Sequence, residues 1–377
     1  MSAQNQQEPW VRRTIREEWF LGVSVATVVI FLLFGDSLVS DFTNPLWLAF
    51  VFIWLFAVVL GSCVAVVRHA DGVAHVLGEP FGTLTLTLSV TTIEVLSISA
   101  VMLHGANEPT LVRDTLFSVV MIILGGMTGV ALLVGGWRHR EQTYNLQGAN
   151  AYLGVIIPMT VLSLTLPNFT LTTPGPTLSF AQQVFLILIF VSLYGIFLAI
   201  QTGRHRTYFT AVDSVHNDPA AASPAGKRAV VRHATLLLAY ILPVAYLAEE
   251  LAYPIDYFIQ TLHVPAALGG VTIAMIVATP EAIGATRAAM ANDLQQSVNI
   301  FLGSVLSTIG LTIPVMLIIS RVTGRTVELG LSGANDVLLL LTLTVSVITF
   351  ASGRTNILQG AVHVVLFGAF VLLLFQG

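Results

Sequence analysis

Charged residues and cysteine are both scarce in this sequence of 377 residues. Only 10% of the residues are charged and 55% are hydrophobic, whereas an average soluble domain has about 25% charged residues. An ordinary soluble domain is therefore excluded. The single cysteine, Cys63, lies in an apolar run, so an intramolecular disulfide is impossible and redox chemistry is not expected.

Motifs that mark nucleotide-binding proteins and common enzymes are also missing. The sequence has no zinc-ligand spacing, no Walker loop, no GxGxxG element and no hydrolase nucleophile elbow. An ATP-driven pump with its own nucleotide domain is therefore excluded for this chain. We expect no cofactor and no nucleic-acid partner, and the sequence leaves the oligomeric state open.

Long apolar runs are what the sequence has instead. Runs of about 20 residues recur along the chain, and each is long enough to cross a bilayer. We therefore predict an all-α polytopic membrane protein with about eleven transmembrane helices. The first run is too long for a signal-peptide core and lacks a small-residue cleavage site, so it is interpreted as a retained helix. The expected spans are about 19–39, 45–67, 81–103, 114–136, 149–166, 178–202, 234–254, 265–286, 297–319, 335–351 and 357–376.

The chain divides at its longest polar stretch, residues 203–233, whose DPAAASPAGK portion is typical of a flexible hinge. This stretch is interpreted as a cytoplasmic linker between two halves. We expect an N-terminal tail and one extra helix over residues 1–44, a first five-helix repeat over 45–202 and a second five-helix repeat over 234–377.

The distribution of basic residues predicts the orientation of the chain. With the N-terminus inside, 13 of the 16 Lys and Arg residues fall on cytoplasmic segments, and only Arg113, Arg321 and Arg325 fall outside. The positive-inside rule therefore places the N-terminus in the cytoplasm and, with eleven spans, the C-terminus outside. The third and eighth spans then run in opposite directions. The two five-helix halves consequently form inverted repeats, which are a transporter architecture.

Two carboxylates interrupt the apolar runs of these antiparallel spans. Glu94 lies in the third span, and Glu281 lies in the eighth, directly after Pro280. Because a charged group inside a membrane span costs at least about 2.5 kcal/mol, each glutamate is a functional-site hypothesis. Pro280 has no N–H, so we expect a helix break that frees the carbonyls of Ile276 and Val277. A broken helix beside a buried carboxylate is typical of cation sites in transporters.

The two halves also match locally around the glutamates. The segment TTIEVLSISAVM pairs with ATPEAIGATRAAM, and LFSVVMIILGG pairs with LGSVLSTIGLT. The second pairing aligns Ser118 with Ser304. Each half is thus predicted to contain a glutamate helix followed by a serine helix.

The side chains around the glutamates offer only oxygen ligands. Glu94 shares one helical face with Thr87, Thr91 and Ser97 at spacings of three and four. In the ninth span, Ser304, Ser307 and Thr308 share a face in the same way. Hard cations such as Ca²⁺ take about six to eight oxygens. Burial disfavours an ionised carboxyl and a bound cation favours it, so the same groups can hold protons or a cation. The structural alternatives are an interhelical hydrogen bond for each glutamate and helix packing for the hydroxyl residues. The predicted cation and proton site comprises Glu94, Glu281, Thr91, Ser118, Ser304, Ser307 and Thr308, with the carbonyls of Ile276 and Val277.

At these residues the chain resembles the cation/Ca²⁺ exchanger superfamily, specifically its cation/proton antiporters and their bacterial sodium–calcium/proton branch. The resemblance runs from VVRHADGVAHVLGEPFGTLTLTLSVTTIEV through HGANEPTLVRDTLFSVVMI to SGRTNILQGAVHVVLF. The two signature repeats of that family map onto about 83–126 and 272–314. The resemblance implies that Glu94 and Glu281 are the paired transport carboxylates, and that the two aligned serines belong to the helices that follow them.

The sequence departs from the wider family just before each glutamate. Many members carry Gly-Asn there, whereas this chain has Val90-Thr91 and Val277-Ala278. The bacterial branch shares this departure, so the expectation of antiport is unchanged.

We therefore expect a secondary antiporter in the bacterial inner membrane. It would export Ca²⁺ and/or Na⁺, with K⁺ as a further candidate, in exchange for protons by alternating access, and its partners would be these ions and the lipid bilayer. The alternatives are a cation channel and an intramembrane hydrolase, which would need a paired Asp, a Ser–His pair or a zinc motif. Glu249 and Glu250 are interpreted as a solvated pair at a span end, and His363 is given no role.

Overall fold

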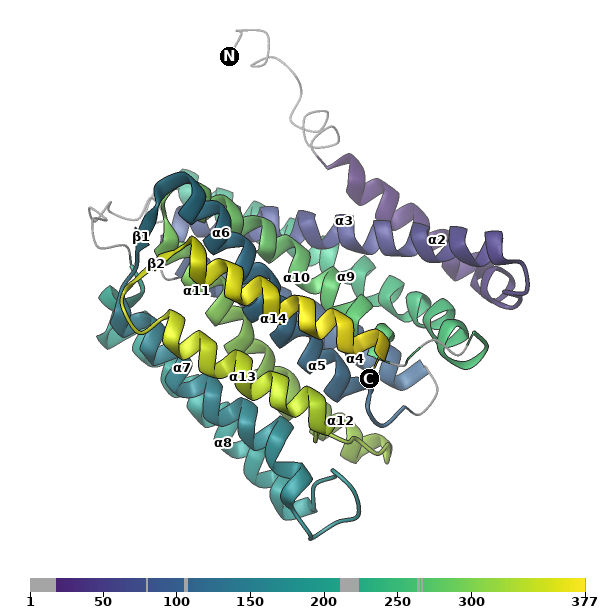
Figure 1. Cartoon of the computed structure of the whole chain (residues 1–377). Coiled ribbons are helices and arrows are strands. Elements are labelled where there is room, and N and C mark those ends of the chain that lie inside the picture. The colour runs from purple at the N-terminus through teal and green to yellow at the C-terminus, as the bar shows by residue number, and fades with distance from the viewer. Residues whose placement is uncertain are drawn as a thin grey trace, which may run out of the picture.

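The computed structural model describes residues 18–78, 81–104, 108–210, 224–262, 265 and 267–376, and the chain forms a bundle of helices (Figure 1). The predicted N-terminal tail up to residue 17 and residues 211–223 of the predicted linker lie outside the described residues. The first half contains α2 (Trp19–Val39), α3 (Pro45–Leu77), α4 (Phe81–His104), α5 (Leu111–Val120), η2 (Met121–Met127), α6 (Thr128–His139), β1 (Glu141–Thr143), α7 (Leu146–Thr160), η3 (Val161–Thr165), η4 (Leu166–Phe169), α8 (Phe180–Ala199), η5 (Ile200–Arg204) and η6 (Arg206–Phe209). The second half contains α9 (Pro224–Gln260), α10 (Ala267–Met290), α11 (Leu294–Ser307), η8 (Thr308–Thr312), α12 (Ile313–Thr323), α13 (Gly333–Thr349), β2 (Arg354–Asn356) and α14 (Ile357–Gln376).

The helices agree with the predicted membrane spans. Among the described residues, 10 helices are long and apolar enough to cross a membrane, and a shorter apolar helix forms α13. The prediction of an all-α polytopic membrane protein is therefore confirmed. Two helices are longer than predicted, since α3 continues to Leu77 and α9 begins at Pro224. Their polar ends were missed because a search for apolar runs stops where polar residues begin, although the backbone remains helical.

α10 is one unbroken helix, so the predicted helix break at Pro280 is wrong. Proline removes one backbone donor, but the turns on either side continue the helix, which packs closely against its neighbours. A Cβ on Gly270 of α10 would lie 2.7 Å from the backbone nitrogen of Thr115 in α5. Ala278, Pro280 and Glu281 are buried as well, so α10 is packed on both sides of the proline. The loss at Pro280 is limited to the N–H that would have reached Ile276.

Four of the described spans contain π-helical turns, and two of these turns, η2 and η8, lie at matching positions of the two halves. α5, η2 and α6 form one continuous span, and α11, η8 and α12 form another. η2 begins at Met121, shortly after Ser118, and η8 begins at Thr308, shortly after Ser304. Because π turns are rare and frequently mark functional sites, the matched serine helices share a structural feature as well as a sequence pattern.

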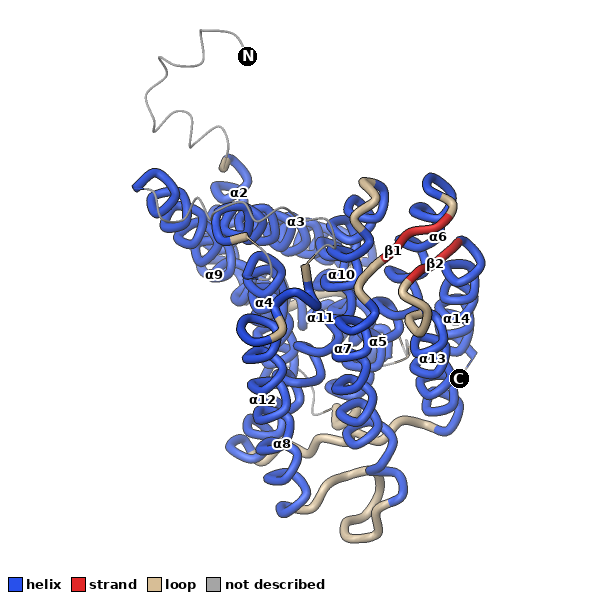
Figure 2. The backbone as a smooth tube through the Cα atoms, turned by 90° about the vertical axis from the view of Figure 1, so that its left-hand side faces the viewer, coloured by secondary structure: helices blue, strands red, loops and turns tan. Residues whose placement is uncertain are grey.

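A two-stranded sheet, which the sequence did not predict, joins the two halves. β1 follows α6 and pairs antiparallel with β2, which precedes α14, so that Gln142 lies opposite Thr355 (Figure 2). Beside this β1–β2 clip, the backbone N–H of Tyr144 donates to the carbonyl of Gly353 at 3.1 Å. Burial raises the pKa of Tyr144 to about 12. Its phenol therefore stays protonated and donates to the carbonyl of Thr349 at 3.4 Å.

The helices next to the clip are in backbone contact. A Cβ on Gly129 of α6 would lie 2.8 Å from the nitrogen of Val364, and a Cβ on Gly360 of α14 would lie 2.6 Å from the nitrogen of Leu133. Glycine permits such close approach between membrane helices. The first half is thus packed directly onto the last helix of the chain.

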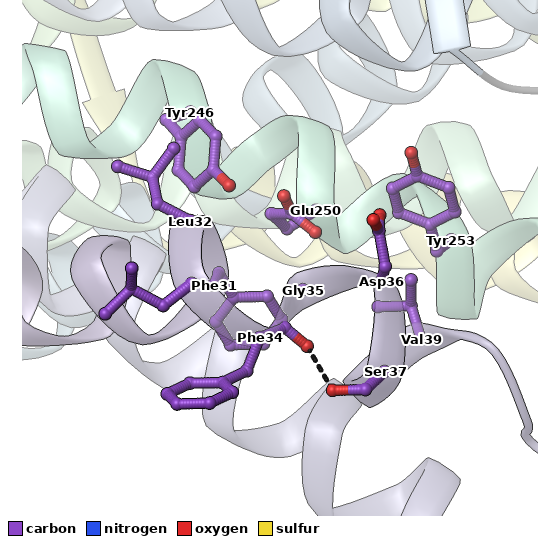
Figure 3. A pocket seen from close by; sticks show the side chains of 11 residues that line it. Phe31, Leu32, Phe34, Gly35, Asp36, Ser37, Val39, Tyr246, Glu250 and Tyr253 are labelled. Carbon is purple, nitrogen blue, oxygen red and sulfur yellow. Dashed lines mark hydrogen bonds between the residues drawn. The ribbon is translucent and has the colours of Figure 1, made fainter.

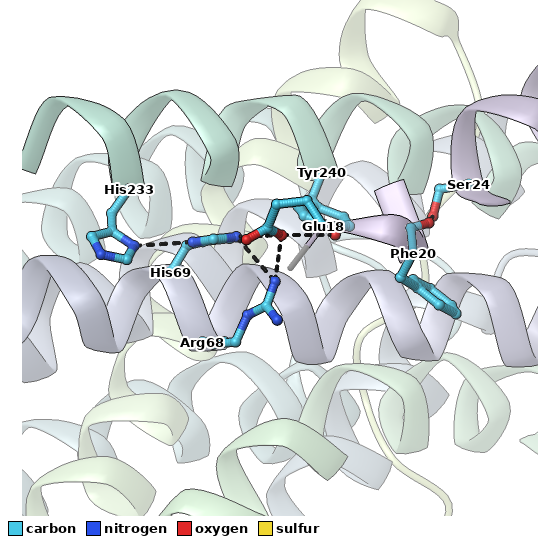
Figure 4. A network of polar contacts seen from close by, with 7 residues as sticks. All are labelled: Glu18, Phe20, Ser24, Arg68, His69, His233 and Tyr240. Atoms are coloured by element: carbon cyan, nitrogen blue, oxygen red, sulfur yellow. Dashed lines mark hydrogen bonds and ion pairs between the residues drawn. The ribbon is translucent and has the colours of Figure 1, made fainter. Parts of the chain in front are cut away.

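The extra helix α2 is joined to both halves by Glu18, which immediately precedes its first turn. The Glu18 carboxylate forms an ion pair with Arg68 of α3 and lies 3.2 Å from Nε2 of His69. It also accepts a hydrogen bond of 3.1 Å from the phenol of Tyr240 in α9. Nδ1 of His69 lies 3.1 Å from Nδ1 of His233, so α2, α3 and α9 meet around one buried carboxylate (Figure 4).

Candidate functional site

The two predicted glutamates lie at a buried site where α4, α10 and α11 pack together. Glu94 and Glu281 are each 1% exposed. Ser304 donates to Oε2 of Glu281 at 2.5 Å, and Thr308 donates to Oε2 of Glu94 at 2.6 Å. Both donors belong to the span formed by α11 and η8, so a single span holds the two carboxylates through two hydroxyl groups.

A second pair of hydroxyls links α4 to the same span. Thr91 donates to the hydroxyl of Ser307 at 2.7 Å, and Ser307 donates to the carbonyl of Ser304 at 3.0 Å. All three residues are buried. The structure therefore brings together six of the predicted site side chains in one polar cluster. These are Glu94, Glu281, Thr91, Ser304, Ser307 and Thr308.

Each carboxylate has one oxygen left over. Oε1 of Glu94 and Oε1 of Glu281 are buried and have no hydrogen-bond partner among the residues that the structure describes. A buried polar atom without a partner costs free energy comparable to a lost hydrogen bond. A proton or a cation at either oxygen would remove this cost, so the geometry suits a site that exchanges one for the other.

The aligned serines of the two halves do not make equivalent contacts. Ser304 donates to Glu281 as described above, whereas Ser118 donates to the carbonyl of Asp114 in its own helix at 2.6 Å. Ser118 is 1% exposed. It is thus buried on the matching helix, but its hydroxyl satisfies the backbone rather than a glutamate.

The predicted carbonyl ligands lie on the helix that carries Glu281. Ile276 and Val277 are each 3% exposed within α10. Pro280 has no N–H to donate to the carbonyl of Ile276. Ile276 also lines a small cavity together with Ser97 of α4, so this part of α10 lies beside the glutamate helix of the other half.

A second small cavity lies on the other side of Glu94 along α4. Thr87, seven positions before Glu94, lines it together with Tyr152 of α7 and Gln201 of η5. Gln201 donates to the phenol oxygen of Tyr152 at 2.9 Å, and both side chains are buried. Sequence reasoning missed Tyr152 and Gln201, for which the only signal was a polar group inside an apolar run.

His363 is another buried polar residue to which the sequence assigned no role. It is 0% exposed in α14. Its Nδ1 lies 2.6 Å from the carbonyl of Leu124 in the π turn η2, and its Nε2 lies 3.0 Å from the hydroxyl of Thr349. Because a carbonyl can only accept, Nδ1 donates to Leu124 and His363 links the first π turn to α13 and α14.

Glu250 is buried rather than solvated, which corrects the interpretation of the acidic pair in α9. It is 8% exposed because α2 covers it, and a Cβ on Gly35 of α2 would lie 3.7 Å from its carboxylate. Tyr246, Glu250 and Tyr253 face the end of α2, including Asp36, across a pocket (Figure 3). The face of α9 that lines this pocket is different from the face that approaches Ile276.

Sequence comparison places the chain among ion transporters. The pattern of the family described as "Sodium/calcium exchanger protein" matches residues 47–203 and 233–376. A protein of Sinorhizobium fredii (strain NBRC 101917 / NGR234) named as an ionic transporter, y4hA, is 44% identical over 320 residues, which is 83% of this chain and 85% of that protein. The sodium-potassium/proton antiporter ChaA of Escherichia coli (strain K12) is 36% identical over 366 residues, which is 96% of this chain and 98% of that protein.

Solved structures share the fold at lower sequence identity. The structure of native YfkE has a TM-score of 0.70 and 19% identity, covering 95% of this chain and 100% of that chain. The H⁺/Ca²⁺ exchanger CAX has a TM-score of 0.68 and 14% identity, covering 95% of this chain and 88% of that chain. At these identities the likeness concerns the arrangement of the helices.

Proposed function

Because this chain belongs to the sodium/calcium exchanger protein family, we propose that it exchanges Na⁺, K⁺ or Ca²⁺ for protons by alternating access at Glu94 and Glu281. More generally, the protein is a multi-pass membrane transporter of the cation antiporter type, with bacterial relatives. Those relatives are transporters and not enzymes, which removes the intramembrane hydrolase from consideration.

The observation that carries the proposal is the unequal pairing of the carboxylate oxygens. In Glu94 and in Glu281, one oxygen accepts from a hydroxyl of the α11–η8 span and the other has no partner among the described residues. The hydroxyl donors Ser304 and Thr308 fix the orientation of the two groups. The two remaining oxygens are then available to a proton or to a cation.

Coupling follows from the charge of the site. Two ionised glutamates without a cation would carry a charge of about −2 into a region of low dielectric, which is strongly unfavourable. Two protonated carboxyls are neutral, and two ionised carboxylates are neutralised by one Ca²⁺, by two Na⁺ or K⁺ ions, or by one Na⁺ or K⁺ when a single proton stays bound. Rearrangement between the two sides of the membrane is therefore favoured only when the site holds protons or a cation, which makes the exchange obligatory.

The cation that we favour is Na⁺ or K⁺, with Ca²⁺ as the second candidate. A relative that matches 96% of this chain is named as a sodium-potassium/proton antiporter. Carboxylate and hydroxyl oxygens suit hard cations in general, but Ca²⁺ takes about six to eight oxygens. A more distant relative named as a Ca²⁺/H⁺ antiporter, 22% identical over 269 residues, keeps Ca²⁺ in the panel to be tested.

We further propose that the N-terminus lies in the cytoplasm of a bacterial cell, as the basic residues indicate. The single native Cys63 can be replaced by alanine to give a cysteine-free background. In that background Thr207→Cys should react with an impermeant thiol reagent only from the cytoplasmic side, and Thr172→Cys only from outside. Reaction of both cysteines from one side would contradict the inverted orientation of the two halves.

The test of the function is a pair of charge-removing substitutions. Glu94→Gln and Glu281→Gln keep the size of the side chain but cannot ionise, so each should abolish cation-driven proton movement in everted membrane vesicles read with a pH-sensitive dye. The matched control is Glu141→Gln, because Glu141 has a side chain that is 60% exposed at the clip. Substantial proton-coupled transport by either buried variant, at normal expression, would rule out the two-carboxylate site.

A cation channel is the remaining alternative, and the same vesicles distinguish it. An antiporter gives a flux that saturates with cation and moves protons in the opposite direction. A channel would pass cation without proton movement.

A further inference from the structure

Ser97 of α4 has an unusual environment for a buried serine. It is 4% exposed, and its hydroxyl has no hydrogen-bond partner among the residues that the structure describes. Other hydroxyls of α4 donate to a backbone carbonyl four residues earlier, as Ser89 does at 2.7 Å and Ser99 does at 2.6 Å. This local bond is the usual way for a helical serine to satisfy its hydroxyl, and Ser97 does not use it.

Ser97 lines a cavity whose other walls are apolar. Leu251 and Ile255 of α9 and Ile273 and Ile276 of α10 contribute to these walls. The cavity is just large enough for about one water molecule. A lone buried hydroxyl in such a space can bind one water molecule, and a hydrated ion could enter only if the cavity widened.

The cavity lies against both glutamate helices. Ser97 follows Glu94 by three positions, so the two side chains share one face of α4. Ile276 lies shortly before Glu281 on α10, and Pro280 has no N–H to donate to its carbonyl. The Ser97 cavity therefore lies about one helical turn beyond Glu94, toward the end of α4 that follows it.

Hydrogen bonds between loops show which loops lie at the same end of the bundle as the Ser97 cavity. The N–H of Glu328 donates to the carbonyl of Pro109 just beyond α4, at 2.9 Å, and the N–H of Leu329 donates to the carbonyl of Pro176 at 3.2 Å. The end of α4 that follows Ser97 is thus on the same side as the 170–179 loop. Thr87 and the polar cavity with Tyr152 lie toward the opposite end.

We propose that Ser97 is a positioning residue at the outer end of the ion route, where its hydroxyl binds water that hydrates the cation as it arrives at or leaves Glu94. The apolar side chains of Leu251, Ile255 and Ile273 separate this point from the outer surface, and their displacement opens the route. The proposal rests on the function proposed above, because it takes Glu94 as the group that the ion reaches.

Cysteine accessibility tests the route without relying on transport. In the Cys63→Ala background, Ser97→Cys and Ser99→Cys are exposed to a membrane-impermeant, positively charged methanethiosulfonate, applied to one side of the membrane at a time. Thr172→Cys marks the outer side. We expect Ser97→Cys to react from the side on which Thr172→Cys reacts, at least about tenfold faster than Ser99→Cys, and more slowly when Na⁺ or K⁺ is saturating.

Kinetics give the second measurement. Ser97→Ala should raise the KM for the cation several-fold with a smaller change in kcat, Ser97→Thr should restore KM, and Ser99→Ala should leave it unchanged. The proposal is overturned if Ser97→Cys is unreactive from the Thr172 side and Ser97→Ala keeps the normal KM. That result, combined with loss of exchange in Glu94→Gln, would leave the antiporter function intact and reject only the role of Ser97. Exchange that survived in Glu94→Gln would instead reject the function on which the proposal rests.

Discussion

Removal of the Thr308 hydroxyl is the most direct test of how the site holds an ionised carboxylate. Thr308→Val keeps the shape of the side chain but deletes the donor that lies 2.6 Å from Oε2 of Glu94. A hydrogen bond to a charged group contributes about 1.5–3 kcal/mol, and about 1.4 kcal/mol corresponds to a tenfold change in affinity. Since the cation-bound state contains the ionised form of Glu94, the apparent cation affinity should fall about 10- to 150-fold.

The assay is a cation titration in everted vesicles at fixed pH, with Thr308→Ser expected to restore most of the affinity. The matched control is Thr115→Val, because Thr115 is equally buried but donates to the carbonyl of Leu111 in its own helix at 2.8 Å. Thr115→Val should leave the cation affinity unchanged. If Thr308→Val had the same affinity as Thr115→Val, the hydroxyl of Thr308 would not stabilise the ionised form of Glu94, and the proposed role of this hydrogen bond would be refuted.

Three further outcomes are expected. Lowering the pH equally on both sides should raise the apparent KM for the cation, by up to about tenfold per pH unit for each competing proton, and a pH-independent KM would reject a shared site. Pro280→Ala supplies an N–H that can pair with the carbonyl of Ile276, so the affinity for the cation should fall. Thermal stability should be retained or increased, because proline is disfavoured by about 3 kcal/mol in a helix interior. An unchanged cation affinity would show that the Ile276 carbonyl is not a ligand. Glu18→Gln weakens the contacts to Arg68, His69 and Tyr240. The free energy of unfolding should therefore fall by about 1–3 kcal/mol, which would lower the melting temperature in detergent. An unchanged melting temperature would argue against a stabilising role for these contacts.

The parts of this protein that sequence reasoning predicted are those with a chemical signature inside one segment. A span is an apolar run, and Glu94 and Glu281 stand out because a carboxylate in such a run is costly. Ser304 could be placed beside them because each half repeats the order of a glutamate helix and a serine helix, and Thr308 because it shares a helical face with Ser304. These predictions needed no knowledge of how distant segments approach one another.

The features that were missed depend on distant segments or on backbone register. β1 and β2 are 3 residues each, too short to produce a recognisable alternation, and they form because two remote connections lie side by side. The π turns leave no mark in composition. Ser118 and Ser304 align in sequence, yet only the second reaches a glutamate, because the partner of a hydroxyl is decided by the helix packed against it. At Pro280 the rule that proline breaks helices was overridden by tertiary packing around α10.

The contact between α6 and α14 has a consequence for the synthesis of the protein. Gly129, in the first half, is covered by Gly360 and Val364, which lie near the end of the chain, and β1 has no partner until β2 is made. A chain that has been translated only as far as α13 must therefore expose the glycine face of α6 to lipid and leave the edge of β1 unpaired. The packing of α6 is therefore incomplete until α14 is made, so loss of the last twenty residues should send the whole protein to degradation and not merely shorten it.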